Sequence, residues 1–320
     1  MNCLCCGEPI RDTFHNDEKE NTWHAKCIKS FFGTTKMPEL DISEIQLIEL
    51  ANSAVNKGLT IPGVQKKLSL HLSVDDNVRL TIVDYPTGYI LKPQAEEYVM
   101  LPEFEYLAMR LAKIAGIKTV PHALIRMNGK FAYITRRIDR DIKSDSVSQY
   151  AMEDFCQVSN RLTQDKYKGS YESCGRIIKK YSVRSGLDIS ELFLRVAFSF
   201  IIGNSDMHLK NFSFIETEPA NRNFCLSQAY DMLPVNVIMP EDDEQLALTL
   251  NGKKRNIHRN DFLKFAESCS IPLTSANAML NKLCSLSNDF LLQSERSYLS
   301  DSLKLQTKEL IVQRIENIKV

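Results

Sequence analysis

The chain has 320 residues, of which 43% are hydrophobic and 25% are charged, and its 40 basic and 40 acidic residues cancel. This composition is ordinary for a globular protein, and the balanced charge gives no general attraction to nucleic acid or to an anionic membrane. No apolar run reaches the roughly 18 residues of a membrane span, and the first residues lack the basic and apolar segments of a secretory signal. We expect a cytoplasmic protein with no membrane partner and no direct contact with nucleic acid.

The first 33 residues form a cysteine-rich segment. Residue types that bind metals occur there in two pairs, each with two intervening residues: Cys3 and Cys6, then His24 and Cys27. Tetrahedral zinc takes four such ligands, and a segment of about 30 residues is too short to fold on a core of its own. The pattern predicts a structural zinc knuckle, with Cys5 as an alternative ligand in the first pair. The competing interpretation is a group of reduced thiols beside a surface histidine.

Residues 34–140 are predicted to be rich in strands. Apolar residues at helical spacing predict two helices, over 41–56 and from Phe104 to Ile114, and a loop rich in glycine and proline lies between 57 and 66. Strands are predicted at 66–72, 78–83, 89–93, 122–127 and 131–135, with a hairpin turn at Asn128-Gly129. Lys92 stands at the end of one strand, and Glu103 and Glu105 stand in the first turn of the second helix. Taken alone, these charges are also ordinary for a surface and for a helix N-terminus.

Residues 141–320 are predicted to be mainly helical, and the change near residue 140 marks a boundary between two lobes. Helices are expected at 152–160, 174–181, 189–202, 260–269, 274–292 and 297–318, and strands at 211–215, 224–228 and 246–250. The helix over 189–202 is apolar on nearly all sides, which predicts a core helix. Gly203 is expected to end it.

The loop after this helix carries the most informative group of polar residues. Asp206 and Asn211 are five positions apart, as are the base and the magnesium-binding Asn of protein kinase catalytic loops. A hairpin of the strands at 211–215 and 224–228 would return the chain and bring Asp231 beside Asn211. His208 and Lys210 lie within the loop, and they either shape it by hydrogen bonding or contact phosphate or substrate. Together with Lys92, this arrangement predicts phosphoryl transfer of the kinase type.

These residues also resemble the motifs of the HipA kinases of bacterial toxin–antitoxin systems. The loop from Asn204 to Phe214 and the segment Ala229-Tyr-Asp-Met-Leu-Pro234 are similar to the family's catalytic and metal-binding motifs. Thr60-Ile-Pro-Gly-Val-Gln-Lys-Lys67 resembles its phosphate loop. Further matching blocks are found at 101–106, 137–140, 153–157 and 248–253. The resemblance extends in order from about residue 57 to the C-terminus.

The resemblance implies an α+β, bilobal, protein-kinase-like fold with ATP and Mg²⁺ bound between a strand-rich N-lobe (34–140) and a helical C-lobe (141–320). It implies that Asp206 is the catalytic base, assisted by His208 and Lys210, and that Asn211 and Asp231 bind magnesium. Further residues are implied to hold the nucleotide: Lys92 with its partner Glu105, Gly63, Val64 and Gln65 in the phosphate loop, Arg136 and Ile138 beside the adenine, and Tyr230.

The chain departs from the family pattern in three respects. The predicted knuckle over 1–33 stands in place of the small N-terminal subdomain of full-length members. In this respect the chain resembles the shorter HipT-like class. Thr60 stands where the family often has an autophosphorylated serine, and Pro62 replaces a smaller residue.

The resemblance implies a Ser/Thr protein kinase toxin that acts on a protein hydroxyl, as on an aminoacyl-tRNA synthetase. Its implied partners are an antitoxin of the HipB-like DNA-binding type and a separate HipS-like small subunit. Two alternatives are a kinase for a small molecule or lipid, and a non-catalytic regulator that binds nucleotide.

Overall fold

The protein is described from a computed structural model that covers residues 2–10, 22–42, 67–74, 78–82, 87–143 and 146–319. The chain divides into two compact units, one of Met1–Tyr106 with Val120–Val147 and one of Leu107–Thr119 with Ser148–Val320. The predicted division into 1–33, 34–140 and 141–320 is finer than these units and stays a prediction. No helix in the described ranges has both the length and the apolar composition that crossing a membrane requires.

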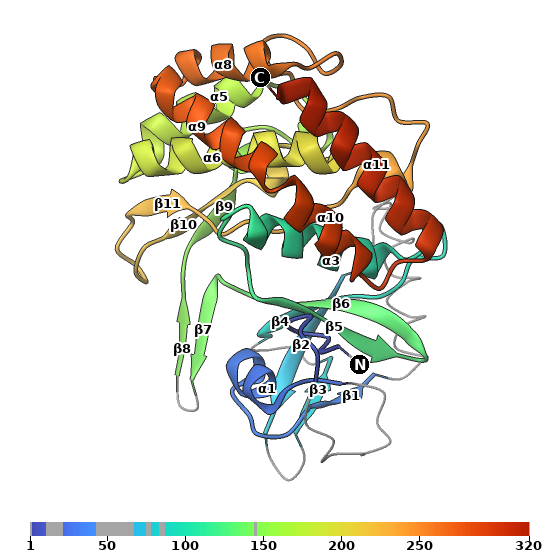
Figure 1. The fold of residues 1–320 in the computed structure, drawn as a ribbon. Helices are drawn as coiled ribbons and strands as arrows, with labels where there is room; N and C mark the ends of the chain where they lie inside the picture. The colour runs from blue at the N-terminus through green and yellow to red at the C-terminus, as the bar shows by residue number, and fades with distance from the viewer. Residues whose placement is uncertain are drawn as a thin grey trace. The chain divides into compact units, whose positions relative to one another are not determined.

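The first unit is built on a six-stranded sheet in the order β1-β3-β2-β4-β6-β5 (Figure 1). Its strands are β1 (Glu39–Asp41), β2 (Leu68–Ser73), β3 (Arg79–Thr81), β4 (Tyr89–Lys92), β5 (His122–Met127) and β6 (Lys130–Arg136). Neighbouring strands are antiparallel except β1 and β3. The predicted turn joins β5 to β6, and Asn128 and Gly129 have φ of 51° and 75°, as a type I′ turn requires. The predicted strand pattern is therefore confirmed where the chain is described.

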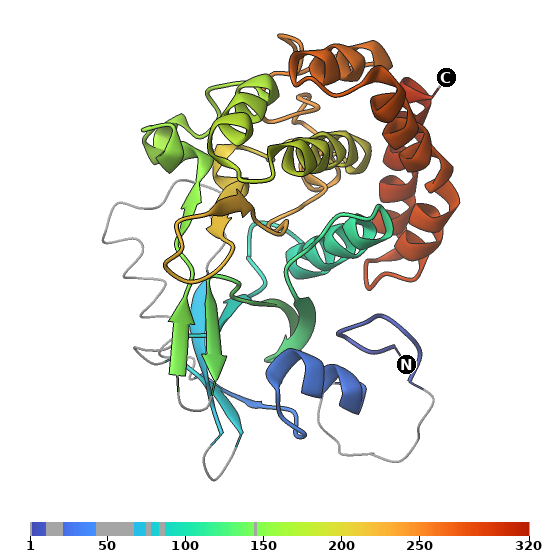
Figure 2. The same ribbon diagram turned by 90° about the vertical axis from the view of Figure 1, so that its left-hand side faces the viewer.

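Helix α1 (Ala25–Phe32) belongs to this unit, and helix α3 (Leu101–Ile114) begins in it and continues into the second unit at Leu107. Figure 2 shows α1 lying beside the loop at the N-terminus. The strands β7 (Arg140–Lys143) and β8 (Ser146–Gln149) form a separate two-stranded ribbon. The predicted helix over 41–56 and the phosphate loop lie largely outside the described residues, and Asp41 ends strand β1 instead of beginning a helix.

The second unit is mainly helical, as predicted. Its helices are α4 (Phe155–Val158), α5 (Tyr171–Tyr181), α6 (Ser185–Ile202), α7 (Val235–Ile238), α8 (Arg259–Ser268), α9 (Leu273–Ser285), α10 (Ser287–Glu295) and α11 (Asp301–Ile318). A three-stranded sheet has β10 (Ser213–Glu216) between β9 (Met152–Asp154) and β11 (Phe224–Leu226). Short 3₁₀ turns occur at η1 (Thr163–Asp165) and η2 (Leu209–Asn211).

Helix α6 is the core of this unit. Phe193 stacks on Phe265 of α8 with ring centroids 5.8 Å apart, and Phe198 meets Phe290 of α10 edge-on at 6.1 Å. Gly203 ends the helix in the left-handed region with φ of 72°. A Cβ there would lie 2.4 Å from Leu310 Cδ2 of α11, so glycine is required both for the turn and for the close approach. The predicted helix end at Gly203 is confirmed.

Three predicted elements differ from the structure. Residues 152–154 are a strand, because Met152 and Asp154 pair with Ile215 and Ser213 of β10, and the helix begins only at Phe155. Residues 246–250 make isolated bridges from Thr249 to Ser170 and from Leu250 to Lys253 instead of a strand. The expected helix over 274–292 is two helices, α9 and α10, interrupted at Leu286, where ψ is 5°.

Candidate active site

The loop after α6 is held by hydrogen bonds to the backbone of Asp206. The side-chain oxygen of the buried Asn204 accepts the Asp206 N–H at 3.2 Å. The Asp206 carbonyl accepts the His208 N–H at 2.8 Å and the Asn211 side-chain amide at 2.9 Å. Because its NH₂ group is used in this way, Asn211 has its amide oxygen available as a ligand. The loop therefore fixes an acid and an amide oxygen in a defined arrangement.

The carboxylate of Asp206 is the accessible group in this loop. Its side chain is 41% exposed, whereas that of His208 is only 7% exposed. Tyr167 donates its hydroxyl to Asp206 Oδ1 at 2.5 Å, and its ring meets His208 edge-on with centroids 5.1 Å apart. Burial and the charge of Asp206 raise the pKa of Tyr167, so the phenol stays protonated and remains a donor. Tyr167 thus orients the carboxylate and leaves its second oxygen free of this bond.

His208 supplies no positive charge at neutral pH. Burial lowers its pKa below the usual 6.5, against the opposing attraction of the Asp206 and Asp231 carboxylates. The ring nitrogen Nε2 lies 3.9 Å from Asp206 Oδ1. A neutral imidazole in this position shapes the loop by packing and polar contacts, which favours the first of the two predicted roles.

The hairpin of β10 and β11 returns the chain to the loop. Ile215 pairs with Cys225, and the Ser227 N–H donates to the Ser213 carbonyl at 2.8 Å. The Tyr230 hydroxyl, 2.6 Å from Ser213 Oγ, donates to the Lys210 carbonyl at 3.0 Å. This hydroxyl is used within the loop, and contact of Tyr230 with a nucleotide stays a prediction.

Asp231 directly follows this tyrosine and has φ of 58°. Asp tolerates this left-handed conformation better than most residues. The preceding Tyr230, whose hydroxyl bonds to the Lys210 carbonyl, brings the chain at Asp231 back to the loop, while binding of magnesium by its carboxylate stays a prediction. The hairpin thus brings a second acid back to the loop that contains Asp206, as predicted from the chain order.

Lys210 is anchored away from the loop. Its Nζ lies 2.7 Å from Asp154 Oδ2, at the junction of β9 and α4. Asp154 also accepts the Gln157 N–H at 2.9 Å and caps α4. The ion pair ties the loop to the three-stranded sheet, so a loop-shaping role is visible, while contact of Lys210 with phosphate stays a prediction.

In the first unit, Lys92 and Glu105 form a buried ion pair. Nζ of Lys92 at the end of β4 lies 2.5 Å from Oε1 of Glu105 in α3, and their side chains are 5% and 0% exposed. The Lys92 ammonium also lies 5.4 Å from the centre of the Tyr133 ring. The other first-turn acid, Glu103, is buried as well, and burial raises its pKa. Of the two acids, Glu105 is the one that contacts Lys92.

The remaining predicted nucleotide contacts fall in two places. Arg136 is exposed at the end of β6, and Ile138 is half-buried in the bend that follows. Between them, Arg137 makes two bonds to Asp139, of 2.9 and 2.6 Å. Four further predicted residues lie outside the described residues: Thr60, Gly63, Val64 and Gln65.

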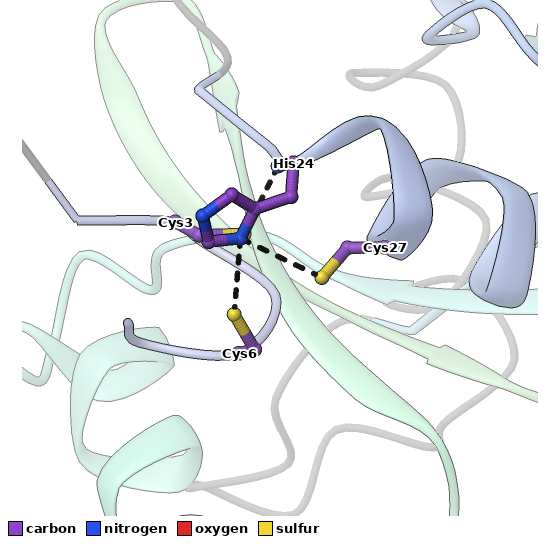
Figure 3. Close-up of side chains that lie close together, drawn as sticks. All are labelled: Cys3, Cys6, His24 and Cys27. Atoms are coloured by element: carbon purple, nitrogen blue, oxygen red, sulfur yellow. Dashed lines mark hydrogen bonds between the residues drawn. The ribbon is translucent and has the colours of Figure 1, made fainter. Parts of the chain in front are cut away.

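The four predicted metal ligands come together in the first unit (Figure 3). The ligand atoms of Cys3, Cys6, His24 and Cys27 all lie within 4.8 Å of one another. Nδ1 of His24 lies 3.3 Å from Cys6 Sγ and 3.9 Å from Cys27 Sγ. Zinc with ordinary bond lengths separates tetrahedral nitrogen and sulfur ligands by roughly 3.5 Å, so the distances fit a closed site.

The outer contacts of this cluster also fit a metal site. Nε2 of His24 lies 3.2 Å from the Pro9 carbonyl, which leaves Nδ1 facing the three sulfurs. A backbone oxygen on the second ring nitrogen is the usual support of a metal-bound histidine. Cys5 is not in the cluster that the described residues form. The structure thus favours Cys3 over Cys5 in the first pair.

Comparison with known proteins identifies the family. Residues 59–289 match the family described as the HipA-like C-terminal domain. The chain belongs to this family. A putative kinase from Haemophilus influenzae is 27% identical over 270 residues, which are 77% of this chain and 76% of that protein. The putative kinase Y4dM of Sinorhizobium fredii is 30% identical over 229 residues, 66% of this chain and 54% of its own.

A third HipA-like relative is the serine/threonine-protein kinase toxin HipA of Shewanella oneidensis, 25% identical over 236 residues, 67% of this chain and 52% of that protein. The chain thus spans about half the length of this toxin and of the Sinorhizobium protein.

Two solved structures share the fold. HipA of Shewanella oneidensis, in a complex with HipB and operator DNA, has a TM-score of 0.69 at 19% identity over 81% of this chain and 65% of its own. The Helicobacter pylori proinflammatory kinase CtkA has a TM-score of 0.52 at 15% identity over 78% of this chain and 94% of its own. The predicted α+β, HipA-like fold is confirmed.

Sequence reasoning missed three residues that support the HipA-like loop: Asn204, Tyr167 and Asp154. Asn204 lies within the matched motif, and its place beside a helix end is typical of an amide that bonds the following backbone. Tyr167 and Asp154 reach the loop from 39 and 56 residues away. Periodicity carries no signal for such contacts.

Proposed function

We propose that this chain is an ATP-dependent kinase that transfers the γ-phosphoryl group to a serine or threonine hydroxyl of a protein. The observation that carries the proposal is the fixed loop in which Asp206 is accessible, Asn211 presents an amide oxygen and the hairpin returns Asp231. Membership of the HipA-like family and the kinase relatives support it. The catalytic loops of protein kinases use the same residue types at the same spacing for phosphoryl transfer.

The residues have distinct proposed roles. Asp206, held by Tyr167, accepts a hydrogen bond from the attacking hydroxyl and takes its proton as the new phosphorus–oxygen bond forms and the bond from the γ-phosphorus to the departing ADP breaks. Asn211 and Asp231 offer the oxygen ligands that Mg²⁺ prefers, so the donor set fits that ion. When bound, Mg²⁺ would neutralise charge on the ATP phosphate oxygens. Lys92, oriented by Glu105, is the proposed ligand of the phosphates.

The proposed biological role rests on likeness to the relatives. The Shewanella protein is named a toxin, and its solved structure is a complex with HipB and operator DNA. By likeness, we propose a growth-arresting toxin with a HipB-like antitoxin, a separate HipS-like small subunit and an aminoacyl-tRNA synthetase as substrate. Thr60 is a proposed autophosphorylation site. A small-molecule or lipid kinase and a non-catalytic regulator are the alternatives.

One experiment separates these functions. Phosphoproteomes are compared between cells that express the chain and cells that express Asp206→Asn at an equal level. We expect growth arrest and a small set of new phosphoserine or phosphothreonine sites only with the natural chain, and phosphorylated Thr60 in the protein itself. Identical phosphoproteomes with arrest in both strains would favour the non-catalytic regulator. A change confined to a metabolite or lipid would favour the other kinase class.

We also propose that the cluster of Cys3, Cys6, His24 and Cys27 holds a structural zinc ion. Four protein ligands close the site, so no position is open for substrate. Their thiolates would repel one another without a cation between them. The geometry described for His24 supports this assignment.

Loss of one zinc ligand should unfold this segment. Cys27→Ser is expected to reduce zinc content from about one ion per chain to nearly none and to lower the melting temperature by about 5 °C or more, because structural zinc contributes directly to folding. The measurements are elemental analysis and thermal unfolding. Cys5→Ser is the matched control, and it should retain zinc because this thiol lies outside the cluster of described residues. Zinc loss in Cys5→Ser but not in Cys27→Ser would contradict the ligand assignment.

A further inference from the structure

The cysteine segment contacts both elements that carry the Lys92–Glu105 ion pair. We call the described residues 2–10 and 22–33 the knuckle. One contact is aromatic: Tyr89 lies against Phe31 and Phe32 of α1, with centroids 5.9 and 5.4 Å apart, and Trp23 packs on the same two rings. The Tyr89 hydroxyl donates to the Phe31 carbonyl at 3.3 Å. Tyr89 begins β4, the short strand that ends at Lys92.

The second contact reaches helix α3 and strand β5. The Tyr106 hydroxyl donates to the Cys5 carbonyl at 3.2 Å, and Tyr106 directly follows Glu105 in the helix. The Leu124 N–H of β5 donates to the Leu4 carbonyl at 2.9 Å. Leu4 is only 2% exposed. The knuckle therefore holds the helix that carries the acid as well as the strand that carries the lysine.

The metal ligands flank the residues that make these contacts. Leu4 and Cys5 lie between the ligands Cys3 and Cys6, so the two carbonyls that bond to Leu124 and Tyr106 belong to the loop that the metal closes. His24 and Cys27 similarly hold the start of α1. A metal in this site fixes both contact surfaces at once. A segment of about 30 residues is too short for a core of its own, so a metal would contribute much of its stability.

We propose that the metal-loaded knuckle positions the Lys92–Glu105 pair, with Tyr106 as a positioning residue, so that metal loading controls nucleotide affinity. This inference rests on the proposed kinase function, because a kinase requires its strand lysine and helix glutamate to be paired before it holds the phosphates productively. The knuckle does not touch the reacting atoms. It acts through the backbone of α3 and of β4, which set the distance between the two side chains.

Binding of Mg-ATP to the full-length, zinc-loaded protein tests the proposal. Tyr106→Phe removes one hydroxyl and keeps the ring, and we expect its Kd for Mg-ATP to rise about fivefold, the effect of one lost hydrogen bond. Zinc content should stay unchanged, and the melting temperature should fall by no more than about 4 °C, because only one hydrogen bond is lost. Removal of zinc with a chelator should weaken binding more, in step with the fluorescence of Trp23, the single tryptophan. Tyr181→Phe in the second unit is the control and should bind as the natural chain does.

A double-substitution cycle shows whether the effect passes through the ion pair. In a Glu105→Gln background, Tyr106→Phe should add less than twofold to the Kd, because the pair that it positions is already broken. Tyr89→Phe gives a second, independent test at the other contact, with a smaller expected rise in Kd. Its lost bond is the one to the Phe31 carbonyl.

Two results would overturn this inference alone, and a third would overturn the kinase proposal as well. If the natural chain binds Mg-ATP and Tyr106→Phe binds it equally well, the knuckle does not position the pair. If Tyr106→Phe has the same fivefold effect with and without Glu105, its action does not pass through that residue. If the zinc-loaded natural chain does not bind Mg-ATP, the kinase proposal itself fails, and this inference fails with it.

Discussion

Replacing Asp206 with asparagine should slow phosphoryl transfer by about a thousandfold, within the range that positioned general bases contribute. Asparagine keeps an oxygen that accepts the Tyr167 hydroxyl, but it cannot take a proton from the attacking hydroxyl. The side chain is 41% exposed, so the exchange removes little packing and the melting temperature should stay within about 1 °C. The measurement is incorporation of labelled γ-phosphate into the chain itself and into its substrates at saturating Mg-ATP.

Asp165→Asn is the matched control for this substitution. Asp165 is an acid in the same unit that pairs with Lys168 at 2.6 Å, and no step of the proposed reaction uses it. Its variant should transfer phosphate at the natural rate. Asp206→Asn with more than a tenth of the natural rate would remove Asp206 from the role of base. An equal loss in both variants would point to a general effect of charge.

The local architecture of the active loop was predictable from the sequence because its causes are local. An apolar helix, a glycine at its end and a hairpin are each written in short stretches of residue types. They place Asp206 after α6 and return Asp231 to the loop without any knowledge of tertiary contacts. The spacing of Asp206 and Asn211 then has chemical meaning because the loop is short and fixed.

The supporting contacts were not predictable because they join distant segments. Asp154 is the example: its segment has helical spacing, and the sequence predicts helix over 152–160. In the structure, Asp154 ends a strand that pairs with β10 and meets Lys210 across 56 residues. Pairing with a neighbouring strand outweighs local helix propensity at such a place.

The knuckle was likewise predictable only in its local features. The two ligand pairs were predictable from spacing, since short-range chelation is a local property. The choice between Cys3 and Cys5 was not, because both fit the first pair by spacing. What decides it is the docking of the loop, in which the Cys5 carbonyl accepts the Tyr106 hydroxyl while the buried Cys3 has its sulfur in the cluster with the other ligands.

Breaking the Lys92–Glu105 pair should damage both stability and activity. Lys92→Met leaves Glu105, which is 0% exposed, without its cation. Removal of one partner of a buried pair typically costs about 3–5 kcal/mol in the free energy of unfolding. Denaturant unfolding followed by Trp23 fluorescence measures this cost, since Trp23 lies in the first unit with the pair. The exposed pair of Arg79 and Asp41 is the control, and Arg79→Ala should cost less than about 1 kcal/mol.

A double substitution separates the effect on stability from the effect on activity. Lys92→Met combined with Glu105→Leu replaces the pair by apolar side chains, which should recover most of the lost stability because no buried charge remains. Phosphoryl transfer should not recover, and its rate should stay at least a hundredfold below that of the natural chain, since no ammonium remains to hold the phosphates. Recovery of activity together with stability would mean that Lys92 serves the fold alone. Loss of activity in a stable double variant would instead place the ion pair in the reaction, because its two charges are gone while the fold is retained.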